Sequence, residues 1–331
     1  MRKSRRRDPS KWIPLEQPLL ELEAHIEELK QLQRSGARDL ADTIADLERR
    51  KDELTMEVFS DLSPWDRVAL ARHQNRPYTL DYIQGMCDDF VELHGDRRYR
   101  DDPAIVAGLA RLDGLPIAVA GHQKARSARE RQLRNFGMAH PEGYRKALRV
   151  MEFAARLGRP MVTLLDTAGA ACLEEAEARG ISEAIAVNQR EMSLLPVPIV
   201  VIIIGEGGSG GAIGLGVGDR ILMLEHAYYS VIAPESCASI LWRDTERKAE
   251  MAAALKLTAD DALALGVVDQ VIPEPVGGAH RNHPEAIRRV KEALVAALRE
   301  LLPIAPGELV EQRYRKFRDM GRAAVERTTV P

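Results

Sequence analysis

Pro198-Ile199-Val200-Val201-Ile202-Ile203-Ile204 is a run of mostly β-branched apolar residues, and Gly205-Glu206-Gly207-Gly208-Ser209-Gly210-Gly211 follows it directly. Such a run is typical of a strand that is buried on both faces. The glycine-rich stretch predicts a turn, and residues 212–219, where small and apolar residues alternate, predict a short, closely packed helix. Together these elements direct backbone N–H groups to one point, where a negatively charged oxygen would bind.

Three kinds of oxygen fit that point. The first is a dinucleotide pyrophosphate, because Gly205-x-Gly207-x-x-Gly210 formally matches the dinucleotide-binding fingerprint; the helix that follows is short and glycine-rich for such a site. The second is an enolate or ureido oxygen in an oxyanion hole. The third is the tetrahedral oxyanion of a serine hydrolase that uses Ser209 with His226, although Ser209 lacks the strained elbow of those enzymes.

Composition excludes several classes of function. The chain has 331 residues and a net charge of -3, which gives no general attraction to nucleic acid or lipid. No apolar stretch approaches the roughly 18 residues that a membrane span needs, and the basic segment Met1–Arg7 is not followed by the apolar part of a secretory signal. We therefore expect a cytoplasmic protein. Cys87, Cys172 and Cys237 are far apart, which argues against a disulfide framework or a zinc site built by this chain alone.

The first part of the chain is predicted to be helical. Apolar residues recur at three- and four-residue spacing on both sides of Ser35-Gly36, which predicts two amphipathic helices paired as an antiparallel hairpin. Thr79 or Asp81 can cap a further helix that runs to about Leu93.

Strands and helices alternate through the middle of the chain. We expect strands at 104–111, 115–121, 161–165, 221–224, 229–232 and 267–273, and helices at 141–157, 174–194, 259–265 and 287–302. This alternation predicts an α/β architecture with right-handed connections. The expected regions are an N-terminal helical region with an antiparallel hairpin (1–100), a core (101–273) and a C-terminal helical extension (274–331).

A basic segment follows the strand predicted at 115–121. It carries five cations within eleven positions, from Lys124 to Arg134. Lys124 and Arg126 are the predicted contacts for a phosphate or carboxylate, because they lie where a core strand ends. The alternative is a solvated basic loop.

Seven motifs in order carry a resemblance to a known family. They are Arg72–Tyr82 (RHQNRPYTLDY), Gly121–Lys124 (GHQK), Arg134–Met138 (RNFGM), Pro141–Ala147 (PEGYRKA), Gly205–Ala212 (GEGGSGGA), Pro234–Trp242 (PESCASILW) and Ile272–Asn282 (IPEPVGGAHRN). With the predicted hairpin they cover nearly the whole chain. The ordered set resembles the alpha subunit of the carboxyltransferase component of bacterial acetyl-CoA carboxylase.

The resemblance implies a crotonase-type core of stacked β-β-α units and an enzyme that is active only with a beta subunit. It implies transfer of a carboxyl group from carboxybiotin, on the biotin carboxyl carrier protein, to acetyl-CoA, giving malonyl-CoA for fatty acid synthesis. The implied partners also include biotin carboxylase, and the implied assembly is an alpha2beta2 heterotetramer. Zinc is expected on the beta subunit and no metal on this chain.

The resemblance also implies the site residues. The N–H groups of Gly207 and Gly208 would hold the ureido oxygen of biotin, which makes a side-chain base unnecessary. Further substrate-binding residues would be Gly169, Ala170, Ser209 and Gly210, beside Lys124 and Arg126.

One segment departs from the family pattern. Where the family usually reads Asp-Thr-Pro-Gly-Ala-Tyr-Pro-Gly, residues 166–173 read Asp-Thr-Ala-Gly-Ala-Ala-Cys-Leu, and Ala125 replaces a usual glycine. Loss of proline and glycine is expected to loosen or reshape this turn. This departure leaves open a non-catalytic structural or regulatory partner of the same fold, and the formal glycine fingerprint leaves open an NAD-dependent oxidoreductase.

Overall fold

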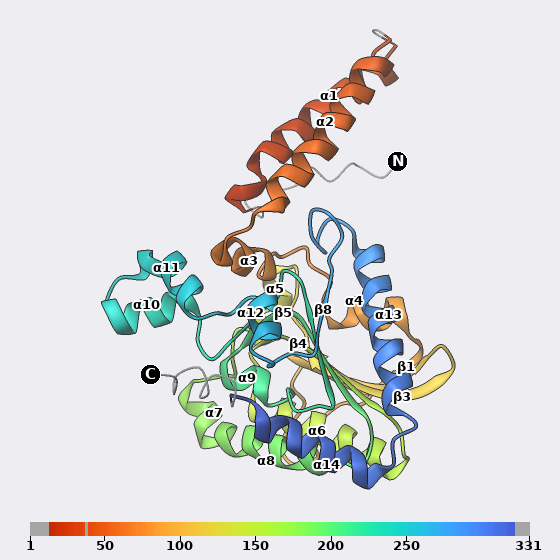
Figure 1. Cartoon of the computed structure of the whole chain (residues 1–331), viewed down its shortest axis with the longest axis vertical. Helices are drawn as coiled ribbons and strands as arrows, with labels where there is room; N and C mark the ends of the chain where they lie inside the picture. Colours follow the sequence, from red (N-terminus) through yellow and green to blue (C-terminus); the bar gives the residue numbers. More distant parts are fainter. Residues whose placement is uncertain (1–12, 37–38, 322–331) are drawn as a thin grey trace, which may run out of the picture.

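The computed structural model describes residues 13–36 and 39–321, so the basic segment Met1–Arg7 lies outside the described residues. Their centre is an eight-stranded sheet (Figure 1). The strands are β1 (Asp88–Glu92), β2 (Ile105–Leu112), β3 (Leu115–His122), β4 (Met161–Thr167), β5 (Ile199–Gly208), β6 (Arg220–Leu224), β7 (Tyr228–Ser230) and β8 (Gln270–Ile272). Their order is β1-β2-β3-β4-β5-β6-β8, with β7 also paired to β5.

The predicted α/β class is observed. β1 to β3 are antiparallel, and from β3 onward the neighbouring strands run parallel, as the alternation of strands and helices predicts. The β2–β3 hairpin turns at Asp113 and Gly114, which both have positive φ, as a tight two-residue hairpin turn requires. Every residue of β4 and β5 is buried, so these two strands form the centre of the core.

Helices cover the sheet and extend beyond it. They are α1 (Gln17–Arg34), α2 (Ala41–Ser60), α3 (Pro64–Ala71), α4 (Thr79–Met86), α5 (Ala128–Leu133), α6 (Pro141–Arg156), α7 (Glu174–Ala178), α8 (Ile181–Leu194), α9 (Ser209–Ile213), α10 (Pro234–Trp242), α11 (Lys248–Ala254), α12 (Ala259–Ala264), α13 (His283–Leu301) and α14 (Pro306–Asp319). Short 3₁₀ turns lie at Pro14–Glu16, Asn135–Gly137 and Thr245–Arg247. In the described part of the chain, none of these helices has the length and apolar character needed to cross a bilayer.

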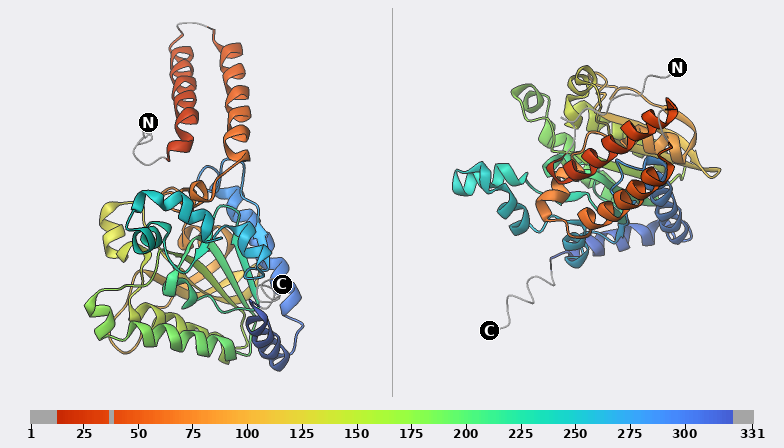
Figure 2. Two further views of the ribbon diagram at one scale, coloured as in Figure 1. Left: turned by 60° about the vertical axis from the view of Figure 1, so that its left-hand side comes forward. Right: turned by 90° about the horizontal axis from the view of Figure 1, so that it is seen from above.

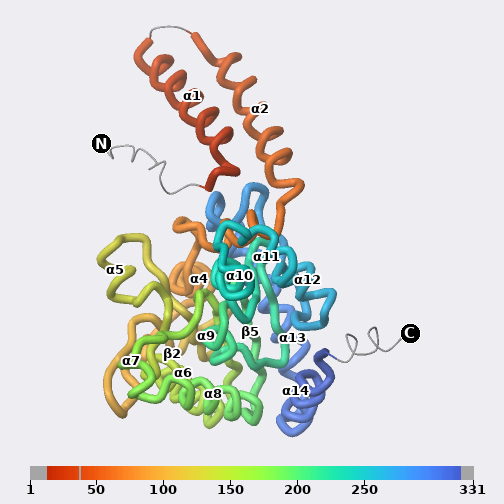
Figure 3. Tube along the Cα trace, turned by 90° about the vertical axis from the view of Figure 1, so that its left-hand side faces the viewer, coloured from red at the N-terminus to blue at the C-terminus, as the bar shows by residue number. Residues whose placement is uncertain are grey.

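The predicted N-terminal hairpin is present as α1 and α2. Both helices are amphipathic and pack antiparallel, and they project together from one end of the sheet domain (Figure 2, Figure 3). The hairpin is anchored at its base, where Glu16 bonds His280 and Arg281 in the segment between β8 and α13. The division of the chain at residues 101 and 274 stays a prediction.

Several predicted elements have different bounds: the helix expected at 212–219 is α9 at Ser209–Ile213, and the strand expected at 267–273 is β8 at Gln270–Ile272. The helix expected to run to Leu93 ends at Met86, because the chain then forms β1, which pairs with β2 at the edge of the sheet. The helix expected at 174–194 is two helices, separated by Gly180 in a left-handed conformation with φ of 80°. The strand expected to end at Ile204 continues to Gly208. The glycines of 205–208 therefore extend a strand, and the helix α9 begins directly at Ser209.

Candidate functional site

Three strands end around a buried ion-pair cluster, which we define as Lys124, Asp166 and Glu206. Lys124 follows β3, Asp166 lies near the end of β4, and Glu206 lies near the end of β5. The Lys124 Nζ lies 2.6 Å from Asp166 Oδ1 and 2.6 Å from Glu206 Oε2. The Glu206 N–H also donates to Asp166 Oδ1 over 3.0 Å. The cluster therefore joins the carboxyl ends of three adjacent strands, the edge at which α/β proteins place their ligands.

Arg72, which follows α3, extends this cluster on its other side. Its Nε donates to Glu206 Oε1 over 2.8 Å, and its Nη2 donates to Glu235 of α10 over 3.3 Å. The Tyr228 hydroxyl donates to the same Glu206 oxygen over 2.8 Å, so both oxygens of that carboxylate accept hydrogen bonds, from donors on different elements. Glu206 is thus fixed by hydrogen bonds to charged and neutral donors.

Burial and ion pairing shift the pKa values of the cluster in opposite directions. Burial would raise the pKa of Glu206, but the charges of Lys124 and Arg72 outweigh it and lower that pKa to about 2. Burial would lower the pKa of Lys124, but Asp166 and Glu206 raise it well above its usual range. For Asp166 burial is the larger effect and raises the pKa, against the opposing charge of Lys124. The shifts of Lys124 and Glu206 therefore favour their charged forms around neutral pH, whereas burial disfavours the charge of Asp166.

The turn after β4 and the junction after β5 pack backbone against backbone. A Cβ on Gly208 would lie 2.3 Å from the carbonyl oxygen of Ala168, and a Cβ on Gly211 would lie 2.4 Å from the carbonyl carbon of Gly169. Positions 208 and 211 therefore accept only glycine without a movement of the facing chain. On the surface side, Ala168 and Ser209 are exposed. This contact brings together four of the predicted site residues, Gly169, Ala170, Ser209 and Gly210, around Gly208.

The two predicted N–H donors lie at the end of β5. Gly207 pairs with Thr167 of β4 on one side and with Tyr229 of β7 on the other. Gly208 pairs with Ser230 and is the last residue of the strand. Their N–H groups thus lie in the hydrogen-bonding plane of the sheet, at the carboxyl end of β5. The next residue, Ser209, has an unusual positive φ of 53°. Their role as donors to a ligand stays a prediction.

Lys124 and Arg126 lie in different environments. The Lys124 side chain is only 14% exposed and points into the ion-pair cluster. Arg126 is 40% exposed, bonds Asp81 and the Arg76 carbonyl oxygen, and lies over the Tyr78 ring. Arg126 is therefore the better placed of the two to meet an anionic ligand from solution.

A cavity of about 720 Å³ lies between the base of the helical hairpin and the core. Arg126 lines it together with Glu23, Lys51, Asp52 and Arg281, among other residues. The cations in this lining are paired: Arg281 bonds Glu23, Lys51 lies 3.4 Å from Asp52, and Arg126 bonds Asp81. The mixed charge of the lining favours no single class of ligand.

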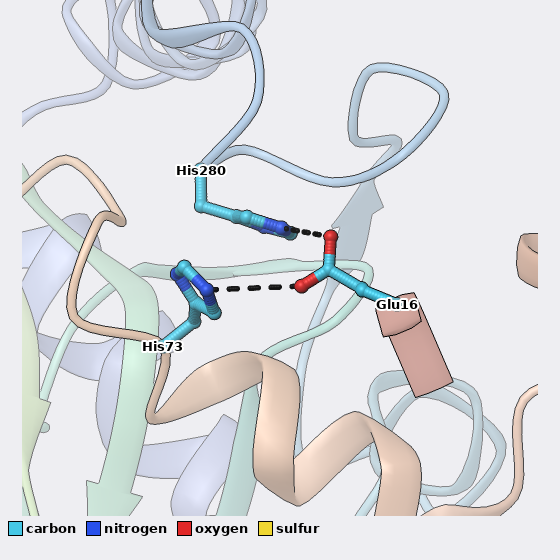
Figure 4. Close-up of side chains that lie close together, drawn as sticks. All are labelled: Glu16, His73 and His280. Atoms are coloured by element: carbon cyan, nitrogen blue, oxygen red, sulfur yellow. Dashed lines mark hydrogen bonds and ion pairs between the residues drawn. The ribbon is translucent and has the colours of Figure 1, made fainter. Parts of the chain in front are cut away.

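One group of described side chains has the composition of a metal site. Glu16, His73 and His280 are buried, and their ligand atoms lie within 4.8 Å of one another (Figure 4). The Asn75 N–H donates to His73 Nδ1, so the neutral ring carries its proton on Nε2, the atom that faces Glu16. Burial lowers the pKa of His73 to about 3, so the ring is neutral. As arranged, the Nε2–H of His73 faces Glu16 Oε2 over 3.7 Å, which is longer than a hydrogen bond, and this tautomer does not offer that nitrogen to a metal ion. His280 bonds Glu16 over 3.0 Å and so secures the base of the hairpin.

The comparison with known sequences identifies the family. The family described as acetyl co-enzyme A carboxylase carboxyltransferase-like matches residues 12–321. The chain belongs to this family. The resemblance predicted from the seven motifs is confirmed, and with it the predicted carboxyltransferase activity.

Relatives of similar length agree with this assignment. The chain is 51% identical to an acetyl-coenzyme A carboxylase carboxyl transferase subunit alpha of Acaryochloris marina, over 93% of this chain and 95% of that protein. It is 52% identical to the protein of the same name from Thermus thermophilus, over 93% of this chain and 98% of that one.

Solved structures show the fold. A Pseudomonas malonate decarboxylase heterodimer matches with a TM-score of 0.57 and 18% identity, over 75% of this chain and 98% of that chain. The transcarboxylase 12S structure with bound methylmalonyl-coenzyme A matches with a TM-score of 0.54 and 21% identity, over 67% of this chain and 41% of that chain. The predicted crotonase-type fold is confirmed, and the alpha-subunit family together with these multi-subunit neighbours shows that the chain works in a complex of subunits.

The sequence did not identify the ion-pair cluster. Asp166 and Glu206 were each expected beside a turn, and Lys124 beside a ligand, but their mutual contact depends on strand register. A signal was available in the parallel alternation of the strands, because polar residues at the ends of adjacent parallel strands meet at one edge.

Proposed function

We propose that this chain transfers the carboxyl group of carboxybiotin, carried by the biotin carboxyl carrier protein, to acetyl-CoA, so that malonyl-CoA forms for fatty acid synthesis. A zinc-bearing beta subunit, biotin carboxylase and the carrier are the proposed partners, in an alpha2beta2 carboxyltransferase in the cytoplasm. The observation that carries the proposal is the contact between the turn after β4 and the junction after β5, where small residues meet and Ala168 and Ser209 are exposed. The ionisable side chains beneath it bond one another, which leaves the chemistry to the backbone.

The ring of biotin is proposed to lie against this junction. Ala168 and Ser209 are exposed, and the residues beside them, Gly169, Ala170, Gly208 and Gly210, have no side chain larger than a methyl group. A flat ring is therefore proposed to approach the main chain here. Exposed apolar side chains, Leu173 and Ile213, follow the two segments and offer contacts to an uncharged ligand or to a partner surface. Carboxybiotin, when bound, supplies the carboxyl group, and negative charge develops on the ureido oxygen as that group leaves.

The proposed role of this chain's backbone is to stabilise that charge. Gly207 and Gly208 are the proposed donors, and the N–H groups of Ser209 and Gly210 follow them at the start of α9. Removing one such preorganised donor typically costs about 3 kcal/mol of transition-state stabilisation. Because a main-chain donor has no pKa near neutral pH, this stabilisation needs no side chain to change its protonation state.

The second substrate is proposed to lie mainly on the beta subunit. Arg126 is this chain's proposed contact to an anionic group of acetyl-CoA, since its guanidinium is partly exposed and lines the cavity below the hairpin. Lys124 is not retained as a proposed contact to acetyl-CoA, because its ammonium is paired with Asp166 and Glu206.

Reconstitution tests the proposed function. The chain alone is expected to be inactive, and addition of the beta subunit should give biotin-dependent decarboxylation of malonyl-CoA, the reverse reaction. No turnover with an authentic beta subunit would contradict the proposal.

The departure at residues 168–173 favours one second candidate, a non-catalytic partner of the same fold. Equal turnover by the assembled complexes of the wild-type chain and of a Gly208→Val variant would support that candidate.

A further inference from the structure

The ion-pair cluster lies directly before both segments of the proposed site. Asp166 precedes Thr167 and the turn after β4, and Glu206 precedes Gly207 and the junction after β5. The ammonium of Lys124 bridges the two carboxylates with equal distances of 2.6 Å. A shift of either segment along its strand would lengthen one of these bonds.

The parts around this bridge are packed without free space. A Cβ on Gly205 would lie 2.5 Å from Asp166 Oδ1, and a Cβ on Gly137 would lie 2.8 Å from Lys124 Cγ. Gly137 has a φ of 82° and ends a stretch in which Asn135 and Phe136 also have positive φ. An unusual backbone conformation thus holds the stem of Lys124 against the ends of β4 and β5.

Lys124 is also the cation on which Asp166 depends. Among the ion pairs of the described residues, Asp166 pairs with Lys124, whereas Glu206 has Arg72 as a second cation. Asp166 is only 2% exposed, so without the ammonium its charge would be buried and uncompensated. The carboxyl group would then take up a proton or turn away, and its bond to the Glu206 N–H would weaken.

We propose that Lys124 is a positioning residue for carboxyl transfer. Its ammonium fixes the spacing between the turn at 167–170 and the junction at 207–210. It thereby holds the N–H groups of the proposed oxyanion site in the orientation that the ureido oxygen needs. The inference rests on the proposed function. It replaces the role predicted from the sequence, because both carboxylates already occupy the ammonium of Lys124 and its side chain is mostly buried.

The test compares three variants in the complex with the beta subunit. Lys124→Met removes the ammonium and keeps the aliphatic stem. The double variant Lys124→Met, Asp166→Asn removes one positive and one negative charge together, so no uncompensated carboxylate is left at position 166. It should fold even if the single variant is unstable. Lys291→Met is the matched control, since Lys291 of α13 makes a 2.6 Å ion pair with Asp113 at the far hairpin.

Four quantities are measured for each variant: kcat and KM for biotin-dependent malonyl-CoA decarboxylation, Tm, and amide hydrogen exchange. Lys124→Met should lower kcat at least 100-fold and change KM for malonyl-CoA less than threefold, because Lys124 acts through the backbone. Exchange at 167–170 and 207–210 should accelerate at least tenfold, and Lys291→Met should change none of these quantities.

The outcomes separate the two claims. A folded Lys124→Met or double variant with at least half of the wild-type kcat and unchanged exchange overturns the positioning role. If the single variant does not fold, the same criteria applied to the double variant decide. If the wild-type complex has no biotin-dependent activity, the proposed function fails, while accelerated exchange in the two segments would still support the structural role of Lys124 and unchanged exchange would overturn it.

Discussion

Replacing Gly208 by alanine tests the close contact between the two segments of the site. The added Cβ would lie 2.3 Å from the Ala168 carbonyl oxygen and 2.5 Å from the Ala168 carbonyl carbon. An ordinary contact is at least 3.4 Å, so the turn after β4 must move by roughly 1 Å. Overpacking of this kind costs about 1–3 kcal/mol of stability. A displacement of about 1 Å near reacting groups lowers the rate by about 100-fold.

The assay for Gly208→Ala is biotin-dependent malonyl-CoA decarboxylation by the complex with the beta subunit, together with Tm. We expect a kcat about 100-fold below wild type, a largely unchanged KM for malonyl-CoA, and a modest decrease in Tm. Gly307→Ala is the control: Gly307 lies at the start of α14, and a Cβ there meets no atom within 4 Å. That control should keep the wild-type kcat and Tm. A folded Gly208→Ala complex with wild-type kcat would refute the reasoning.

Three further predictions concern anchoring, acid stability and binding. Arg313→Met should lower the free energy of unfolding, measured in urea, by about 3–5 kcal/mol, because buried Arg313 pairs with Asp219 and fixes α14. The control Arg315→Met, at an exposed position of the same helix, should change that free energy by less than about 0.5 kcal/mol. Equal effects of the two variants would contradict the prediction. Burial would raise the pKa of Glu274, but its buried ion pair with Arg76 lowers that pKa to about 2. The stability that Glu274 contributes is therefore complete above about pH 5 and is lost as the pH falls toward 2. Glu274→Gln should flatten the fall in unfolding free energy between those pH values, and an unchanged slope would argue against this. Arg126→Ala should raise KM for malonyl-CoA about tenfold with little change in kcat, because one charged contact to the substrate is lost. An unchanged KM in steady-state kinetics would show that Arg126 is not a substrate contact.

The fold was predictable wherever one signal decided an element. The β-branched run at 198–204, the Asp113-Gly114 turn and the apolar spacing in the N-terminal helices each have one physical reading, and each element is present. The helix predicted to Leu93 failed because strand β1 is short, half-exposed and at a sheet edge, so its residues carry little pattern of their own.

The sequence identified the segments that form the candidate site but not the contacts between them. A turn was expected at Gly205, because glycine is typical of turns, but β4 and β7 supply pairing partners that hold Gly207 and Gly208 in the strand. The salt bridges of Lys124 depend on the register of β4 against β5, which no local pattern specifies. The charge of Lys124 and its place after a strand therefore suggested a contact to a ligand, whereas in the tertiary structure its ammonium pairs with Asp166 and Glu206.

The most direct measurement is a crystal structure of the complex of this chain with its beta subunit and biotin. The proposed mechanism predicts two main-chain nitrogens of the 207–210 segment, those of Gly207 and Gly208, within about 3.2 Å of the ureido oxygen. It also predicts Lys124 between Asp166 and Glu206, without contact to biotin. A ureido oxygen bound by side chains, or Gly207 and Gly208 N–H groups that donate to β4 or β7 in that complex, would contradict it.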